Sequence, residues 1–363
     1  MDIKNLETQY LNAKEQYYNG TPVMTDFEFD TLEQELIAVG SDVVKIVGTQ
    51  TDRNAKFPHI TPMLSLAKFQ ASQNGDAPTV AFVAWAQPIA AKSQNHFGFT
   101  PKFDGDAANA IYKNGKLWKI LSRGNGTAGR DYTKKLKIQV PATIPVLGEV
   151  EVRGEVVIAK SVFAAKYSTF KNERNFVAGV LNNDKSIPAE KDIVFMAMEI
   201  KQTVSGISEY IPVSNLETWG FNKNYKLPEF YYHYNDFQTA YNKMLEYRNT
   251  SCPFLLDGFV VKVAEKYRPI FGENSHDPNW AVAIKFPAKE VIATIIDIEW
   301  NQGKTGQFTP VAIFEPVDLD GSTVARASAY NYGFVMEKGL KPGTRVTLRK
   351  AGDIIPQILT VLD

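Results

Sequence analysis

The chain has 363 residues, with 40 Lys or Arg against 40 Asp or Glu and 44% hydrophobic residues, which is the composition of a globular protein with more than one domain. Its one cysteine, Cys252, excludes an internal disulfide and a zinc site built from several thiolates. The N-terminus has no charged-then-apolar export signal, and no apolar run is long enough to span a membrane. We therefore expect a cytoplasmic protein without a membrane partner.

The first fifty residues predict a hairpin of two helices. Residues 3–18 repeat apolar side chains every three or four positions, and an Asn-Gly pair then ends the pattern. A second helix is expected from Thr25, which has Glu28 at the spacing of a capping box, to about residue 39. On this helix Asp26, Phe29 and Asp30 can share one face. That face is either a binding surface or a pair of first-turn acids beside a core phenylalanine.

Residues 51–77 are rich in Pro, Asn, Gln and Gly and predict a linker that docks onto a new domain. Residues 107–121 then predict a β-hairpin around Asn114-Gly115. A glycine-rich loop with a leading arginine follows at 123–129, RGNGTAG. It lacks the Gly-Lys-Ser/Thr end of a phosphate-binding loop of the P-loop type.

The strongest candidate for a reactive stretch is residues 99–106, FTPKFDGD. Lys102 is the candidate nucleophile, because an unprotonated amine can attack phosphorus. We expect Asp104 on the same side of an extended strand, where it could orient the lysine or help to hold a cation. Taken alone, the motif is equally compatible with a solvated lysine before a turn.

Three further strands, at 149–158, 255–263 and 280–291, carry charged residues among apolar ones. A lysine inside an apolar strand is costly unless its amine reaches a partner or water. With the reactive stretch, these strands bring together Lys102, Lys262, Lys285, Asp104, Glu155 and Asp257. This set suits a pocket for a nucleotide phosphate and a divalent metal, whereas any one lysine alone could be a snorkelling edge residue.

From about Val291, five short alternating strands joined by turns predict a small barrel of the oligonucleotide-binding (OB) kind. Residues 113–137 contain eight Lys or Arg against one acid, with aromatic residues between them. A second basic cluster consists of Lys338, Lys341, Arg345, Arg349 and Lys350. Each cluster is either a solvated face or a phosphate-facing surface. The four histidines lack metal-ligand spacing, and we assign them no role.

The order of these motifs resembles that of the NAD-dependent DNA ligases. The matching blocks are YYNGTPVMTDFEFDTLEQEL, PMLSL, PKFDG, EVRGE, FKNERN, DGFVVKV, WAVAIKFP, NQGKTGQFTPVAIFEPV and RKAGDIIPQI. The resemblance implies an α+β chain of three domains. These are a helical hairpin at 1–53 that binds the nicotinamide mononucleotide half of NAD+, a nucleotidyltransferase domain of antiparallel sheets with flanking helices at 54–287, and an OB-fold DNA-binding domain at 288–363.

The resemblance also implies the reaction. Lys102 would attack the α-phosphorus of NAD+ and release nicotinamide mononucleotide. AMP would then pass to the 5′-phosphate of a nick in double-stranded DNA, and the 3′-hydroxyl would displace it. Mg²⁺ or Mn²⁺ would be required and zinc would not. We expect a monomer that acts in a bacterial cell or in a bacterium infected by a virus.

The site residues follow from the same resemblance. Glu155 would accept a ribose hydroxyl, Lys262 and Lys285 would stabilise charge at the α-phosphate, and Asp257 with Asp104 would orient the lysine or hold the metal. The nucleotide pocket would also be lined by Ser65, Leu66 and Arg123. The hairpin would bind nicotinamide mononucleotide through Tyr17, Tyr18, Asp26, Phe29 and Asp30. The DNA contacts would be Arg174, Lys341, Arg345, Arg349 and Lys350.

Several residues depart from the family pattern. Thr100 stands where an acid is common, Tyr18 where histidine is frequent, Phe29 where tyrosine is, and Asn125 where the related loop has aspartate. Asn182 replaces the arginine usually found eight residues after Arg174, which puts one contact to the nick in question.

Bacterial relatives of this family continue into a zinc module, a helix-hairpin-helix domain and a terminal interaction domain, and we expect none of these within residues 1–363. It could be a compact viral ligase, half of a split enzyme that needs a second protein, or a fragment. Two other functions remain open. One is a nick-binding protein whose catalytic residues have decayed, and the other is a nucleotidyltransferase that uses ATP or GTP on RNA ends.

Overall fold

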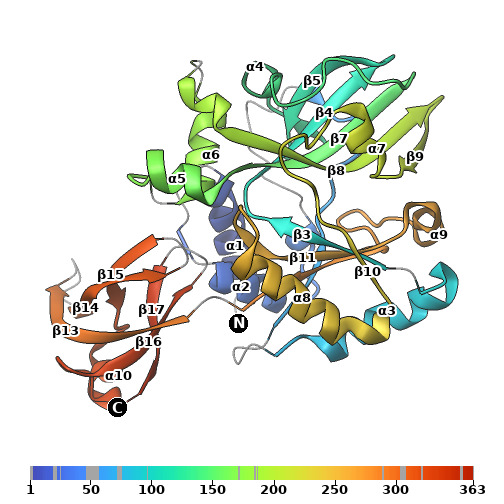
Figure 1. The fold of residues 1–363 in the computed structure, drawn as a ribbon. Coiled ribbons are helices and arrows are strands. Elements are labelled where there is room, and N and C mark those ends of the chain that lie inside the picture. Colours follow the sequence, from blue (N-terminus) through green and yellow to red (C-terminus); the bar gives the residue numbers. More distant parts are fainter. Residues whose placement is uncertain are drawn as a thin grey trace. The chain divides into compact units, whose positions relative to one another are not determined.

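The chain folds into two compact units, residues 45–287 and residues 1–44 with 288–363 (Figure 1). The computed structural model describes residues 3–18, 23–24, 26–45, 57–71, 76–95, 97–170, 172–183, 185, 187–287, 290–302, 308–319, 322–351 and 355–362. No helix in these ranges is both long and apolar enough to cross a membrane. The predicted division into three functional domains stays a prediction.

The predicted helical hairpin is present. It consists of α1 (Ile3–Tyr18), α2 (Asp26–Ala38) and a short 3-10 turn, η1 (Asp42–Lys45). Its small apolar core is formed by Tyr10, Leu32, Leu36 and Val44. Thr25 lies outside the described residues, so the predicted capping box remains a prediction.

The first sheet of the larger unit has the strand order β10-β3-β11-β12-β2. These strands are β2 (Ala67–Gln70), β3 (Phe97–Phe103), β10 (Phe230–Tyr232), β11 (Leu256–Val263) and β12 (Ala281–Lys285). Helices α3 (Thr79–Ser93) and α8 (Phe237–Thr250) pack against one face through a core that includes Phe82, Phe97 and Phe259. Strand β12 is shorter than the strand predicted at 280–291. It ends at Lys285, two residues before Pro287.

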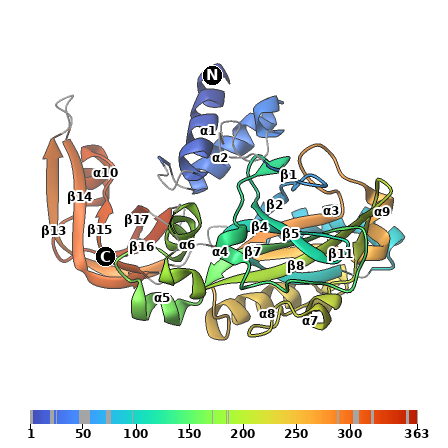
Figure 2. The ribbon, with the colours of Figure 1, turned by 90° about the horizontal axis from the view of Figure 1, so that it is seen from above.

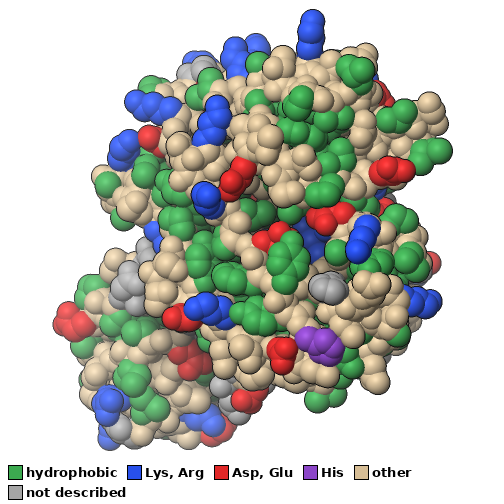
Figure 3. Space-filling view, turned by 45° about the vertical axis from the view of Figure 1, so that its right-hand side comes forward, with side chains coloured by type: hydrophobic (Ala, Val, Ile, Leu, Met, Phe, Trp, Pro, Cys, Tyr) green, Lys and Arg blue, Asp and Glu red, His purple; other side chains and the backbone are tan. Residues whose placement is uncertain are grey.

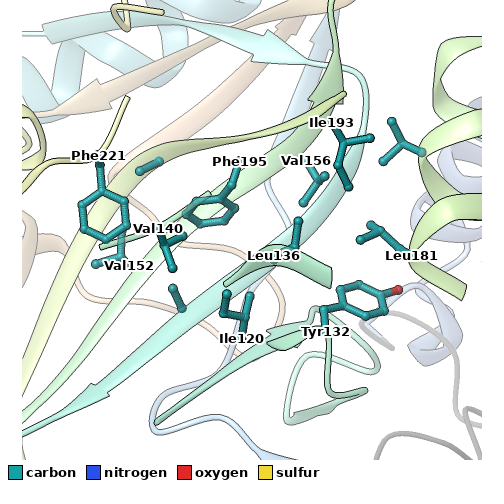
Figure 4. Packing of buried hydrophobic residues seen from close by; sticks show 14 of the residues in the cluster. Ile120, Tyr132, Leu136, Val140, Val152, Val156, Leu181, Ile193, Phe195 and Phe221 are labelled. Carbon is teal, nitrogen blue, oxygen red and sulfur yellow. The ribbon is translucent and has the colours of Figure 1, made fainter. Parts of the chain in front are cut away.

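The second sheet has the order β5-β4-β7-β8-β9 and is antiparallel throughout. These strands are β4 (Asp106–Lys113), β5 (Lys116–Ser122), β7 (Glu149–Ile158), β8 (Ile193–Val204) and β9 (Ile207–Ile211). The predicted Asn114-Gly115 turn joins β4 to β5, and both residues have positive φ. One face packs against α4 (Thr133–Leu136) and α6 (Glu173–Asn182) through the core drawn in Figure 4.

The expected linker at 51–77 is partly regular structure. Within it, β1 (Phe57–Pro58) pairs with β6 (Ala128–Gly129), and β2 is the edge strand beside β12. Shorter elements complete the unit: α5 (Lys160–Lys166), α7 (Asn215–Trp219), α9 (Arg268–Phe271), η2 (Pro188–Lys191), η3 (Tyr234–Asp236) and η4 (Glu265–Tyr267). The segment after residue 56 therefore belongs to a two-stranded sheet with β6 at one end and to the first five-stranded sheet at the other.

Residues 290–362 form the expected five-stranded closed barrel, drawn in orange and red in Figure 2. Its elements are β13 (Glu290–Gln302), β14 (Phe308–Leu319), β15 (Ser322–Ser328), α10 (Tyr332–Lys338), β16 (Arg345–Ala351) and β17 (Ile355–Val361). The interior contains Ile295, Phe314 and Leu348. The fold is thus α+β with an OB-type barrel, as predicted.

Candidate active site

Strand alternation gives the first sheet one apolar and one charged face. Phe97 and Phe99 point into the core beneath α3 and α8. Lys102 has the opposite parity on β3, and strand pairing places Lys262 and Lys285 on its side of the sheet. The three predicted lysines therefore share one face.

The second sheet turns a charged face toward these lysines. Asn109, Arg153 and Glu199 form one cross-strand row. Glu199 Oε2 lies 3.9 Å from Lys262 Nζ on the first sheet. Because both apolar faces are covered by helices, the charged faces meet in the interior of the unit.

Lys102 and Asp257 form the ion pair at the centre of the site. Lys102 Nζ donates to Asp257 Oδ2 over 2.5 Å, and both side chains are partly exposed. The register of β11 against β3 shifts at Asp257, between Leu256 and Gly258. The other oxygen, Asp257 Oδ1, is buried without a hydrogen-bond partner.

Gly258 lies between two of the lysines. It pairs with Lys102 on one side and with Lys285 on the other, so the three residues form one row. A Cβ at this position would lie 2.1 Å from the carbonyl oxygen of Ile284. Only glycine therefore fits, and it leaves the two lysines facing one another across a bare backbone.

Lys262 lies at the other end of the charged face, four residues along β11 from Gly258, which is about 13 Å. Burial lowers the pKa of Lys262, and the carboxylate of Glu199 offsets part of that effect. Burial alone would raise the pKa of Glu199, but four cations, led by Lys262 and Arg268, lower it. The two ends of the face thus have different electrostatic surroundings.

Three carboxylates gather around Arg174, close to Lys102. Arg174 Nη1 donates to Asp104 Oδ1 over 2.9 Å. Burial, together with the charges of Asp106 and Asp104, raises the pKa of Glu155 to about 8, although Arg174 and Lys102 oppose the shift. Burial also raises the pKa of Asp106 to about 6. Asp106 was not predicted as a site residue, although it stands two residues after Asp104.

Ser65 and Arg123 also come together. Arg123 Nη2 donates to Ser65 Oγ over 2.8 Å, and its backbone nitrogen donates to the carbonyl of Ala107, which pairs with Glu155. Leu66 is partly buried against the first sheet's core. Arg123 is thereby placed at the carboxylate end of the site.

A buried polar chain that sequence reasoning missed connects Arg123 to Lys262. His59 Nε2 donates to the Arg123 carbonyl over 3.1 Å, which leaves Nδ1 to accept from Asn109 Nδ2 at 3.2 Å. Asn109 also donates to Glu151 Oε1 over 2.6 Å.

The chain continues through Arg153. Its Nη2 donates to Glu151 Oε2 over 3.1 Å and to the Thr61 carbonyl over 2.8 Å. Its Nη1 lies 3.9 Å from Glu199 Oε1, and Glu199 in turn reaches Lys262. No sequence signal identifies this chain, because His59 is a single histidine whose partners are tens of residues away.

The predicted hairpin residues remain largely undescribed. Of the five, only Phe29 has a described side chain, and it stacks on Tyr10 with ring centroids 4.7 Å apart. The side chains of Tyr17, Tyr18, Asp26 and Asp30 lie outside the described part of the structure. In the barrel, Arg345 and Arg349 alternate with the buried Val346 and Leu348 and so point outward. Lys341 is exposed, and the side chain of Lys350 is not described.

Several cations of the basic segment 113–137 are paired with acidic side chains in the folded protein. Lys113 pairs with Glu149 at 3.0 Å and Lys119 with Asp131 at 2.5 Å, and the buried Lys135 pairs with Glu190 at 2.7 Å. Acidic and basic side chains are interspersed on the face drawn in Figure 3. Three of the eight cations of this segment are thus paired with acids, and a phosphate-facing role for the segment stays a prediction.

A divalent metal ion at this site would have few protein ligands. Among the described residues, no group of three or more His, Cys, Asp or Glu side chains could hold an ion. Asp104 is engaged by Arg174, whereas Asp257 Oδ1 is an unsatisfied buried oxygen. This fits Mg²⁺, which is commonly held by one or two carboxylates together with substrate phosphates and water.

Comparison with known proteins gives matches along the whole chain. A family model for the NAD-dependent DNA ligase adenylation domain matches residues 51–289, and one for the NAD-dependent DNA ligase OB-fold domain matches residues 292–363. A third model, described as the PGRL1 N-terminal domain, matches residues 2–52.

Curated relatives agree with the first two models. A DNA ligase of Saccharophagus degradans is 32% identical over 400 residues, covering 99% of this chain and 57% of that protein. A DNA ligase of Alkaliphilus oremlandii is 32% identical over 373 residues, covering 95% of this chain and 54% of that protein. The chain therefore spans a little over half the length of these relatives.

Proposed function

Because the chain belongs to the NAD-dependent DNA ligase family, we propose that it takes AMP from NAD+ onto Lys102 and uses it to seal nicks in double-stranded DNA. The observation that carries this proposal is the 2.5 Å contact between Lys102 Nζ and Asp257 Oδ2 on a face shared with Lys285. The contact puts a carboxylate that can accept a proton directly on the amine that must be unprotonated to attack phosphorus.

In the first step, Lys102 Nζ forms a bond to the α-phosphorus of NAD+. The bond from that phosphorus to the oxygen of nicotinamide mononucleotide breaks, and the oxygen leaves with the electron pair. Asp257 orients the amine and is placed to take the proton that it sheds. In the next two steps, AMP moves to the 5′-phosphate at the nick, and the 3′-hydroxyl displaces AMP to form the phosphodiester.

The other residues divide between the two ends of the charged face. Lys285, across Gly258 from Lys102, is placed to stabilise charge on the α-phosphate, and Glu155 to accept a ribose hydroxyl. Lys262 was predicted at the α-phosphate as well, but its place along β11 favours a contact further along the nucleotide. Ser65, Leu66 and Arg123 would line the pocket.

A magnesium ion, when bound, would withdraw charge from the phosphate oxygens, with Asp257 Oδ1 as its protein ligand. Asp104 is better suited to hold Arg174 than to bind the ion, because its Oδ1 already accepts from that guanidinium. We place the protein in a bacterial cell or in a bacterium infected by a virus.

We assign the hairpin to the nicotinamide mononucleotide half of NAD+ and the barrel to DNA. Deleting residues 1–50 should abolish AMP acquisition from NAD+ while leaving closure of pre-adenylated nicks largely intact. Equal loss of both activities would contradict the assignment of the hairpin. Neutralising Lys341, Arg345, Arg349 and Lys350 should weaken nick binding and reduce its salt dependence.

The test of the whole proposal is sealing of a fluorescently labelled nicked duplex by the purified chain with magnesium, comparing NAD+ with ATP. We expect sealing with NAD+ and none with ATP, and no covalent AMP on the Lys102→Ala variant. AMP acquisition without sealing would identify an adenylation unit that needs a second protein. DNA binding without any AMP acquisition would identify a nick-binding protein and refute the enzyme assignment.

A further inference from the structure

Lys262 lies between two small residues at the far end of the charged face. On β3 it pairs with Gly98 and on β12 with Ala281, and neither of these has a polar side chain. The side chain of Lys262 is only 16% exposed, so its amine is largely removed from water. A buried charge is costly without a counter-charge, and here that counter-charge has to come from outside the sheet.

The second sheet supplies the counter-charge through Glu199 of β8. Glu199 Oε2 lies 3.9 Å from Lys262 Nζ and 3.4 Å from Arg268 Nη1. Glu199 Oε1 lies 3.9 Å from Arg153 Nη1. One carboxylate is thus shared by three cations.

Arg268 holds this carboxylate in place. The Arg268 side chain is 4% exposed, and its Nε donates to the carbonyl of Val263 over 3.0 Å. Its guanidinium carbon lies 4.8 Å from the centre of the Tyr210 ring and 4.4 Å from that of the Trp280 ring. A guanidinium fixed in this way leaves the Glu199 carboxylate little freedom to turn away.

Lys262 depends on Glu199 more than the two arginines do. Each arginine has a second acid at ion-pair distance, Glu151 at 3.1 Å for one and Glu265 at 3.4 Å for the other. Among the described residues, Glu199 is the only acid at ion-pair distance from Lys262. Loss of the Glu199 charge would therefore affect Lys262 most.

The electrostatic surroundings of Lys262 point the same way. Burial lowers the pKa of Lys262, and the charge of Glu199 opposes that shift more than the charges of Glu229 and Glu265 do. The charged groups that act on Lys262 or on Glu199 are Arg268 of α9, Arg153 of β7, Lys201 of β8, Glu229 before β10 and Glu265 of η4. Two tyrosines also lie close by: Tyr210 interacts with the Glu199 charge, and Tyr231 pairs with Gly98. Without the Glu199 charge, the pKa of Lys262 would fall further, and the amine would lose its proton at a lower pH.

We propose that Glu199 is a positioning residue, which holds Lys262 charged and in place so that Lys262 can donate to the bound nucleotide. The inference rests on the proposed function and deepens it. A charged amine donates a stronger hydrogen bond than a neutral one, whether the acceptor is a phosphate, a hydroxyl or a ring nitrogen. Nucleotide binding should therefore need the Glu199 carboxylate most at the pH values where Lys262 would otherwise be neutral.

The test is the affinity for NAD+ of a Lys102→Ala chain, which cannot take AMP, measured by calorimetry at about pH 6 and about pH 8. Adding Glu199→Gln should raise the dissociation constant by less than about threefold at the lower pH and by about tenfold at the higher pH. With Lys102 intact, Glu199→Gln should raise the KM for NAD+ in the same pH-dependent way. The maximal rate of AMP acquisition should stay within about threefold of wild type at each pH.

Two further variants make the test specific. Glu265→Gln removes an acid that pairs with Arg268 and acts less on Lys262, so its effect on the dissociation constant should stay below about twofold at both pH values. In a Lys262→Met chain, the added change Glu199→Gln should have the same effect at both pH values, because no amine remains to titrate.

The inference is overturned if Glu199→Gln weakens NAD+ binding equally at both pH values or not at all, or if Glu265→Gln has as large an effect. A pH-dependent effect that persists in the Lys262→Met chain would equally overturn it. Should Glu199→Gln not fold, the double variant with Lys262→Met decides, because it removes both charges. A folded double variant would support the pairing, and an unfolded one would overturn it.

Failure of the proposed function gives a different result. A wild-type chain that acquires no AMP, while the Lys102→Ala chain binds NAD+ with the expected pH dependence, would refute the transfer reaction and still support the inference. A chain that binds no NAD+ at all would refute both.

Discussion

Lys102 and Asp257 are 155 positions apart in the sequence, yet pairing of β3 with β11 brings Nζ and Oδ2 to 2.5 Å. Asp257→Asn keeps the shape of the side chain and removes its charge and its ability to take a proton. We expect AMP acquisition from labelled NAD+ to slow by about 10²-fold or more.

The control for this variant is its melting temperature. A partly exposed ion pair contributes at most about 1 kcal/mol, so the fold should survive the change. An adenylation rate within twofold of wild type would show that Asp257 has no part in the reaction.

The raised pKa of Glu155 predicts that the stability of the fold depends on pH. Its folded-state pKa of about 8 lies above the ordinary value of 4.5, so between these values the folded state holds a proton that the unfolded chain has released. The contribution of Glu155 to stability is therefore complete below about pH 4.5 and is lost as the pH rises to about 8. Glu155→Gln should melt progressively higher than wild type as the pH is raised from 5 to 8. Parallel melting curves across that range would contradict this.

The lowered pKa of His59 predicts the opposite dependence of stability on pH. Burial holds its pKa below 6.5, so wild type loses stability as the pH falls through 6.5 toward the folded-state value. His59→Gln should cost about 1–3 kcal/mol at pH 8, because Asn109 and the Arg123 carbonyl lose a buried partner. In denaturant titrations, the difference in free energy of unfolding between wild type and His59→Gln should become smaller below pH 6.5.

Gly258→Ala tests the row that joins Lys102 to Lys285. The added Cβ would meet the Ile284 carbonyl at 2.1 Å and force β11 away from β12, at a cost of about 1–3 kcal/mol. AMP acquisition should fall more than this loss of stability explains, because Lys285 moves relative to Lys102. Gly179→Ala, in α6, meets only Phe170 at 4.0 Å and should instead stabilise by about 0.5–1 kcal/mol.

The sequence was most informative where a pattern and a structural period coincide. The apolar repeat of residues 3–18, the Asn114-Gly115 turn and the alternating strands of the barrel all predicted the elements that form. The same alternation identified Glu155 and Lys262 as charges on otherwise apolar strands. Helix α3 was missed because its sequence, TVAFVAWAQPIAAKS, is apolar on most sides and contains Pro88, so no amphipathic repeat distinguishes it.

Contacts between distant segments could not be predicted. His59 meets Asn109 only because β1 docks on β6, and Lys135 meets Glu190 only because α4 lies beside η2. Arg130 meets Asn182 because a loop and the end of a helix converge. Sequence pattern and spacing predict which secondary structure a segment adopts. These contacts depend instead on which other segments pack beside it.

The inward-facing charges of the two sheets also affect how residues 45–287 come apart. The two larger apolar cores lie on the outer faces, beneath α3 and α8 on one sheet and α4 and α6 on the other. The inner faces are joined by ion pairs such as Lys262 with Glu199 and by a smaller apolar cluster that includes Phe103 and Met196. Largely buried pairs of this kind are screened little by salt, and their attraction is offset by the cost of removing both charges from water. A phosphate-rich ligand bound between the two sheets would contact cations of the inner faces, and we expect it to raise the melting temperature of this unit.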